Sequence, residues 1–227
     1  MSFALKLSKN EHSTSECPAL DKELKKEIDA MLSDTGDWKE RRLTELFREI
    51  SEINFSSVSD GLGAQSKNDL IKIKYMGREV ELSHSDFKNG PDIWDKLLIL
   101  MYIKNSGSCN ISGKWIAFRD LKDGSIRADA FKEICEKPLA GMFEKNKDEF
   151  MNKLTAMGAE RASGFSAPHS LVINPLPKIP FLILLWPGEE DFEADCKVLL
   201  DSTATFFLDV EALLYLGQAL ARSVKTW

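Results

Sequence analysis

The residues best placed to do chemistry lie where two apolar strands are expected to end. Asp201 and Ser202 follow one apolar run, and Trp186 closes another. Polar side chains at strand ends often point into a crevice, and aromatic side chains often form its walls. Trp115 and Arg119 come from a second aromatic-rich segment, although such residues more commonly pack into a core. We therefore predict a cofactor-binding pocket bordered by these five residues.

The usual catalytic patterns do not occur in the sequence. None of the three histidines, His12, His84 and His169, has a metal-ligand partner at a recognisable spacing. The phosphate-loop, Gly-x-Gly-x-x-Gly and Gly-x-Ser-x-Gly patterns are missing. Aromatic residues are present but no nucleophile is paired with a base, so we assign no catalytic residue and leave enzymatic activity open.

An acidic turn follows Trp186. It contains four carboxylates close together, at Glu189, Glu190, Asp191 and Glu193. These groups could bind a cation or meet a basic partner. A solvated turn is the simpler interpretation.

The composition is that of a globular protein. A chain of 227 residues with 43% hydrophobic and 29% charged residues can bury a core in one domain, or in one domain plus an appendage. A formal charge of -6 argues against nucleic acid or an anionic membrane as a partner. No run approaches the ~18 apolar residues that span a bilayer, and the N-terminus lacks the features of a signal peptide. We therefore expect a cytoplasmic protein; the sequence does not indicate its oligomeric state.

The four cysteines are scattered along the chain. Cys17, Cys109, Cys135 and Cys196 include no Cys-x-x-Cys pair, so the sequence predicts neither a disulfide framework nor a complete zinc site. The last three are expected to be buried thiols.

The N-terminal segment pairs a short helix pattern, Met-Ser-Phe-Ala-Leu-Lys-Leu at 1–7, with Cys17-Pro18. It resembles the second half of the four-cysteine [4Fe-4S] module of the corrinoid iron-sulfur protein large subunit. In that module three cysteines precede a Met-x-Phe-Ala-x-Lys-Leu helix, and a fourth follows in a Cys-Pro pair. The resemblance implies that Cys17 is a metal ligand and that the third cysteine would stand just before Met1.

This chain holds one of the four thiolates that such a cluster needs, so it cannot complete the cluster alone. Either the natural protein begins further upstream, or the lineage lost the cluster and kept a remnant. A third interpretation, in which Cys17-Pro18 is an ordinary loop, also stays open.

Apolar periodicity predicts the elements that must position these residues. Two helices, at 20–33 and 38–53, are separated by Asp-Thr-Gly-Asp, and a serine-rich loop at 56–68 follows. We assign residues 1–20 to the iron-sulfur remnant, 21–68 to a helical appendage and linker, and 69–227 to the main domain. Within the main domain we expect a hairpin at 69–83, strands at 169–175, 181–186 and 196–200, and helices at 92–104, before Pro138, at 141–157 and at 210–224.

The strand at 181–186 is apolar throughout, so we expect it to be buried on both faces at the centre of a sheet. The hairpin should join this sheet, and the helices at 92–104 and 210–224 should cover it. The predicted fold class is α+β, with a mixed or antiparallel sheet, covering helices and an N-terminal helical appendage.

The main domain carries a second resemblance. Three strings, Ile-Pro-Phe-Leu-Ile-Leu-Leu-Trp-Pro-Gly-Glu-Glu-Asp-Phe at 179–192, Gly-Lys-Trp-Ile-Ala-Phe-Arg at 113–119 and Tyr-Met-Gly-Arg-Glu at 75–79, are similar to the family called domain of unknown function 3786. The similarity runs from about residue 69 to the C-terminus. It implies an anaerobe that uses iron-sulfur and corrinoid-linked one-carbon metabolism, and it implies no catalytic residues.

Two classes of function follow. The first is a non-catalytic binding or accessory protein of an iron-sulfur or corrinoid system, which binds a corrinoid, another large cofactor or a partner protein. The second is an enzyme whose redox or methyl-transfer chemistry belongs to a bound cofactor. If the protein binds no chromophore, the interpretation that remains is a protein-interaction module without a cofactor.

The iron-sulfur resemblance makes a testable prediction about the gene. The DNA just upstream of the Met1 codon should read in frame as cysteine-containing sequence. Protein expressed anaerobically from an upstream start should then contain iron and show the visible charge-transfer absorption of a thiolate-bound cluster. An upstream stop codon with no in-frame cysteine would contradict this prediction.

Overall fold

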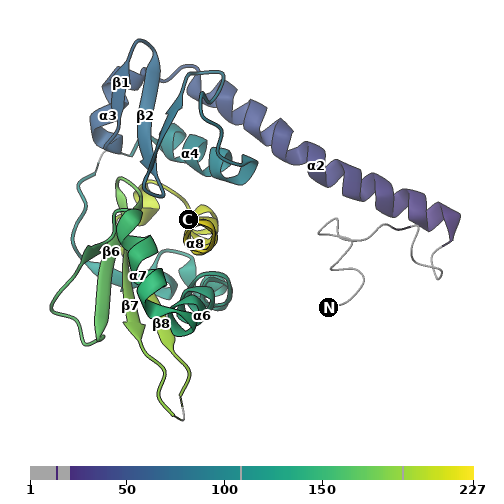
Figure 1. Ribbon diagram of the computed structural model, residues 1–227. Helices are drawn as coiled ribbons and strands as arrows, with labels where there is room; N and C mark the ends of the chain where they lie inside the picture. The colour runs from purple at the N-terminus through teal and green to yellow at the C-terminus, as the bar shows by residue number, and fades with distance from the viewer. Residues whose placement is uncertain (1–13, 15–20, 108, 191) are drawn as a thin grey trace. The chain divides into compact units, whose positions relative to one another are not determined.

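The computed structural model describes residue 14 and residues 21–107, 109–190 and 192–227 (Figure 1). Cys17 and His12 lie outside the described residues. The chain divides into two compact units, residues 1–45 and 46–227. Among the described helices, none combines the length and the apolar character needed to cross a membrane.

One long helix, α2 (Lys22–Ile50), contributes residues to both units. The Asp21 carboxylate caps it by accepting hydrogen bonds from the backbone N–H groups of Glu23 (3.0 Å) and Leu24 (2.8 Å). The predicted interruption at 34–37 was wrong, because the helix runs through it. A glycine inside a helix costs only about 1 kcal/mol relative to alanine, which the rest of a long helix can offset.

A small antiparallel sheet, in the order β1-β2-β3, opens the second unit. Its two long strands form the predicted hairpin and bury Ile71, Ile73, Val80 and Leu82. The predicted loop at 56–68 was wrong in part, because helix α3 occupies most of it. Asn54 caps α3, and the apolar side chains Phe55 and Leu62 of this helix are buried. The bounds are α3 (Phe55–Leu62), β1 (Gln65–Lys67), β2 (Leu70–Tyr75) and β3 (Arg78–Leu82).

The larger sheet has five antiparallel strands in the order β4-β8-β7-β6-β5. This arrangement confirms the α+β class and the antiparallel sheet. The expectation that the hairpin joins the same sheet was wrong: the hairpin pairs with β1, and its turn meets the larger sheet where Met76 N–H donates to the Pro175 carbonyl (3.0 Å). The strands are β4 (Trp115–Ala117), β5 (Glu160–Arg161), β6 (His169–Leu176), β7 (Ile179–Trp186) and β8 (Asp195–Asp201).

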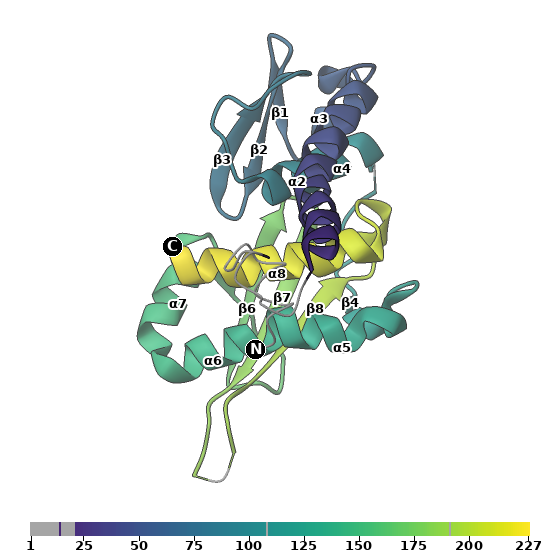
Figure 2. The ribbon, with the colours of Figure 1, turned by 90° about the vertical axis from the view of Figure 1, so that its right-hand side faces the viewer.

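Strand β7 is the centre of this sheet, as predicted, and its residues from Ile179 to Leu185 are buried. Helices cover one face, as Figure 2 shows, where α8 (Val210–Thr226) and the helical run of α5 and α6 lie in front of the strands. The other face carries no helix of the second unit. There the segment 162–167 packs against Leu182 and Leu184.

The helical run consists of α5 (Ala128–Phe131), a π-helical turn η4 (Lys132–Glu136) and α6 (Lys137–Lys145), followed by α7 (Lys147–Ala156). The prediction that Pro138 ends a helix was wrong. Pro138 falls in the first turn of α6, directly after the π turn, where a missing N–H is tolerated. The break comes instead at Asn146, whose extended backbone ends α6 and whose side chain caps α7.

The π turn places a carboxylate against the edge of β8. Strand β4 pairs only with residues 199–201 of β8, so the earlier part of β8 has no strand on that side. There Glu136, which is 6% exposed, accepts hydrogen bonds from Val198 N–H (3.1 Å) and from the Lys197 ammonium (2.9 Å). The Glu136 side chain thus satisfies a buried backbone group that a neighbouring strand would otherwise pair.

This arrangement predicts the effect of removing Glu136. The E136A variant should lose about 1–3 kcal/mol of unfolding free energy, because the buried Val198 N–H would be left without an acceptor. Urea denaturation followed by circular dichroism measures the loss. The E133A variant removes an exposed carboxylate of the same π turn and should change stability by less than about 0.5 kcal/mol. Equal effects for the two variants would contradict the role assigned to Glu136.

Candidate functional site

The structure brings the two predicted tryptophans to the same face of the sheet. Trp115 and Trp186 both pack against a small cluster of Ala167, Leu182 and Leu184 on the face that the helices leave open. Both tryptophans are only half-buried. Packed core therefore does not enclose them, and their predicted role in cofactor binding stays a prediction.

Asp201 lies directly opposite Trp115 in the β4–β8 pairing and is fully buried. Its Oδ1 accepts hydrogen bonds from the N–H and hydroxyl groups of Ser112 (3.1 and 2.9 Å) and of Thr203 (2.9 and 2.6 Å). Its Oδ2 accepts one from Gly113 N–H (2.7 Å). This carboxylate therefore fixes the segment entering β4 and the turn leaving β8.

The hydrogen bonds around Asp201 also set its protonation. Burial by itself raises the pKa of Asp201, but the hydrogen bonds from Thr203 and Ser112 outweigh it and hold the pKa below its usual range. The group therefore stays ionised at neutral pH as an acceptor of hydrogen bonds.

Of the other two predicted residues, Ser202 lies beside this cluster, and Arg119 follows the end of β4 that runs away from it. Ser202 has its hydroxyl 2.9 Å from the Ser112 hydroxyl, and its N–H donates to the Lys114 carbonyl (2.9 Å). Arg119 is exposed on a short 3-10 turn, η2 (Phe118–Asp120). The β4–β8 pairing thus brings Ser202 and Asp201 together with Trp115, and a role for Ser202 and Arg119 in binding stays a prediction.

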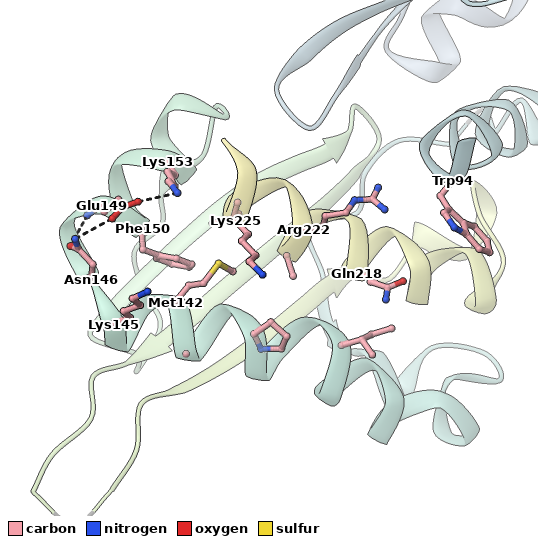
Figure 3. Close-up of a pocket in the computed structure, with 15 residues that line it drawn as sticks. Trp94, Met142, Lys145, Asn146, Glu149, Phe150, Lys153, Gln218, Arg222 and Lys225 are labelled. Atoms are coloured by element: carbon pink, nitrogen blue, oxygen red, sulfur yellow. Dashed lines mark hydrogen bonds and ion pairs between the residues drawn. The ribbon is translucent and has the colours of Figure 1, made fainter. Parts of the chain in front are cut away.

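A hollow lies on the helical side of the sheet. It is a groove of about 940 Å³ between α8 and the helices α6 and α7, with one end at α4 (Ile93–Asn105) (Figure 3). Its apolar lining residues are Trp94, Ile134, Pro138, Met142, Phe150, Ala221 and Val224. Phe150, Ala221 and Val224 are buried and form its floor. The elements that position this floor are helices whose apolar stripes pack on the sheet.

Cationic side chains line the same groove. Lys145, Lys153, Arg222 and Lys225 contribute four positive charges, against one lining carboxylate, Glu149. This local excess of positive charge contrasts with the formal charge of -6 on the whole chain. The groove therefore combines an apolar floor with a basic rim, which suits a ligand that has an apolar body and anionic groups.

Two of the four cations already have partners. Lys153 pairs with Glu149 (3.0 Å), and Arg222 pairs with Asp95 (2.5 Å) and Asp92 (3.1 Å). Lys145 and Lys225 are exposed and form no ion pair with any residue that the structure describes. Figure 3 shows Lys225 reaching from α8 and Lys145 from the end of α6, with Met142 and Phe150 close by. These two lysines are the groups most available to an anion.

Arg222 lies further along the groove, between Lys225 and Trp94 (Figure 3), and also belongs to a polar cluster. The Tyr75 hydroxyl donates a hydrogen bond to Asp95 Oδ1 (2.6 Å), the same oxygen that Arg222 contacts. Burial, with a further contribution from Asp95, raises the pKa of Tyr75 well above its usual value. Burial also raises the pKa of Asp95, although the hydrogen bonds from Tyr75 and Arg222 oppose it. The cluster ties the β2–β3 hairpin and α4 to α8.

The remaining chemistry-bearing residues are held in the structure by packing. Cys135 and Cys196 are buried as predicted, and burial raises the pKa of both thiols, which makes them poor nucleophiles. Cys109 is only half-buried. The His84 ring stacks on the Phe55 ring, with 3.9 Å between the ring centroids. Nowhere in the described ranges do three or more metal-ligating side chains come together.

The groove was not predicted from the sequence. The one available signal was the spacing of Gln218, Arg222 and Lys225, which puts three polar side chains on one face of α8. A polar helix face usually points to solvent, so this spacing alone does not indicate a site. The opposing wall comes from α6 and α7, about 70 residues earlier in the chain, and only the fold brings it there.

Comparison with known proteins gives one match. Residues 54–223 match the family described as Domain of unknown function (DUF3786). No curated protein and no solved structure matches the chain. The match covers most of the second unit, including every residue that lines the groove except Val224 and Lys225.

The hydrogen bonds of Asp201 predict a pH-dependent stability. Because the folded pKa is lowered, the contribution of Asp201 is present above its unfolded pKa of about 3.9 and is lost as pH falls through the folded pKa. The D201N variant should therefore be less stable than the wild type by about 1–3 kcal/mol at pH 7, and the difference should shrink below about pH 4. Urea denaturation across this pH range measures it.

The D195N variant is the matched control, since Asp195 is exposed on the same strand. It should change stability by less than about 0.5 kcal/mol at pH 7. A D201N difference that stays constant down to pH 2 would show that the ionised form of Asp201 is not what the fold requires.

Proposed function

The chain belongs to the DUF3786 family, a domain of unknown function, and from the geometry of its groove we propose that it is a binding protein for a large ligand with anionic groups. The observation that carries this proposal is the pair Lys145 and Lys225, two lysines beside an apolar floor with no carboxylate partner among the described residues. A bound anion would supply the opposite charge that these cations lack. An apolar ligand body would cover Phe150 and Met142.

The volume and shape of the groove support a large ligand. A hollow of about 940 Å³ lies at the upper end of the range of about 300–1,000 Å³ that is usual for small-molecule and cofactor sites. One side is open, so part of a ligand would stay in water. The proposal assigns binding and orientation to the protein and assigns no catalytic residue.

We propose a corrinoid as the first ligand class to test, and a role as an accessory protein of iron-sulfur and corrinoid-linked anaerobic metabolism. This part rests on the resemblance of residues 1–20 to a cluster module of a corrinoid protein. Cys17 would be one ligand of a [4Fe-4S] cluster, which needs further thiolates from outside this chain. The corrinoid would supply the redox or methyl-transfer chemistry, and the groove residues would hold it.

Two probes test the proposal. Cyanocobalamin, whose anionic group is a phosphodiester, tests a corrinoid through its visible absorption, and anilinonaphthalene sulfonate tests an aromatic anion through its fluorescence. The K145E/K225E variant should bind the accepted probe at least about tenfold more weakly than the wild type, equivalent to about 1.4 kcal/mol. The K67E/K122E variant makes the same change of charge at exposed lysines outside the groove, and should bind like the wild type.

Each outcome decides one part of the proposal. Binding of the sulfonate but not of the corrinoid would remove the corrinoid and keep the anion-binding groove. An equal loss of probe affinity in K145E/K225E and in K67E/K122E would show that net charge, rather than the groove, controls binding. If W186A lost probe binding while K145E/K225E kept it, the ligand would be assigned to the open face of the sheet rather than to the groove. No binding of either probe by the wild type would overturn the proposal.

A further inference from the structure

The connection between β7 and β8 extends beyond the sheet as an arm, whose described residues are 187–190 and 192–194 (Figures 1 and 2). Its end is closed by two backbone hydrogen bonds, from Glu189 N–H to the Phe192 carbonyl (2.9 Å) and from Phe192 N–H to the Glu189 carbonyl (3.0 Å). The Phe192 side chain is 75% exposed. The arm therefore presents a large apolar side chain on a hydrogen-bonded turn.

The charge of the arm is opposite to that of the groove. Glu189, Glu190 and Glu193 are exposed around Phe192, and the sequence from 187 to 196 contains no lysine or arginine. Single exposed apolar residues are common on proteins. Here the exposed aromatic residue is surrounded by carboxylates at the end of a projecting hairpin. This combination is complementary to a groove with an apolar floor and a basic rim.

The base of the arm is packed against α6. Glu144 accepts a hydrogen bond from Ala194 N–H (3.4 Å). A Cβ atom added at Gly188 would lie 2.9 Å from Glu144 Oε1 and 3.1 Å from the Phe192 carbonyl oxygen, so the arm and the α6 side chain lie in close contact there. In Figures 2 and 3 the arm leaves the sheet beyond α6, on the side away from α8. The tip therefore points away from the groove of its own chain.

We propose that the arm of one copy docks in the groove of a second copy. Phe192 would cover the apolar floor near Met142 and Phe150, and the arm's glutamates would pair with Lys145 and Lys225. Each copy has one arm and one groove, so two copies that exchange arms about a two-fold axis close into a dimer. This inference shares with the proposed function the premise that the groove binds an anionic, apolar group.

The contact should be weak and reversible. A hairpin tip buries less surface than the roughly 1,200 Å² at which stable interfaces begin, and two acidic copies repel one another overall. Sedimentation equilibrium of the full chain, at concentrations up to about 200 μM, should show a weight-average mass that rises from the monomer toward the dimer.

Two variants remove one half of the contact each. F192S removes the apolar tip, and K145E/K225E removes the basic rim; all three side chains are exposed, so both variants should fold, as circular dichroism can verify. Each should dimerise at least about tenfold more weakly than the wild type. The matched control is F206S, because Phe206 is 66% exposed in the short turn η5 (Ala204–Phe206), outside the arm.

Mixing the two variants gives the decisive test. F192S keeps an intact groove and K145E/K225E keeps an intact arm, so the heterodimer regains one of the two contacts and should associate more tightly than either variant does alone. A wild type that stays monomeric throughout the range would overturn the proposal. So would an F206S variant that loses as much association as F192S, or a mixture that associates no more tightly than the two variants do alone.

Binding of the sulfonate probe separates this inference from the proposed function. F192S should bind the probe at least as well as the wild type, because its groove is unchanged and no arm competes for it. Dimerisation without probe or corrinoid binding would remove the proposed function and keep the arm contact. Probe or corrinoid binding without dimerisation would keep the proposed function and overturn the arm contact.

Discussion

The burial of β7 on both faces is the constraint on which the rest of the second unit depends. Seven consecutive apolar residues, Ile179 to Leu185, need packing partners on each side of the sheet. On one side α8 and the helical run of α5 and α6 provide them, and the space that these helices leave between them becomes the groove. On the other side the cover is thinner, which leaves Trp115 and Trp186 half-buried. Both candidate binding surfaces thus follow from how one strand is covered.

The strand next to β7 shows a second constraint, the pairing of every buried backbone group. Strand β8 has a full partner in β7 but only a short one in β4. Two carboxylates hydrogen-bond at this edge: Glu136 accepts from the Val198 N–H of the strand, and Asp201, the last residue of the strand, accepts from the flanking residues Ser112, Gly113 and Thr203. One is supplied by a π turn and the other by the strand itself. Both are buried acids with structural partners, so their acidity gives no reason to assign them catalysis.

Sequence patterns predicted the elements whose signal is local. The apolar run of β7, the alternation of the β2–β3 hairpin, and the helices α4 and α8 are all read from neighbouring residues, and the structure confirms them. Pairing between distant segments has no such signal, so the hairpin was placed in the wrong sheet. The groove depends on three helices that meet only after folding. Asp201 was singled out for its position at a strand end, but its five hydrogen-bond donors come from Ser112, Gly113 and Thr203, which pattern alone does not bring together.

Arg222 is the one residue shared by the groove and the hollow beside the β2–β3 hairpin. Its guanidinium is held by Asp92 and Asp95, and the hydroxyl of Tyr75 holds Asp95 from the other side. An anion in the groove near Arg222 would draw on the same positive charge, and so would weaken its hold on Asp95. Thermodynamic linkage makes this effect reciprocal: whatever tightens the tyrosine–aspartate–arginine chain lowers the affinity of the groove for anions, and the converse holds equally. If an anion binds at Arg222, ligand binding in the groove and the anchorage of the hairpin are therefore coupled.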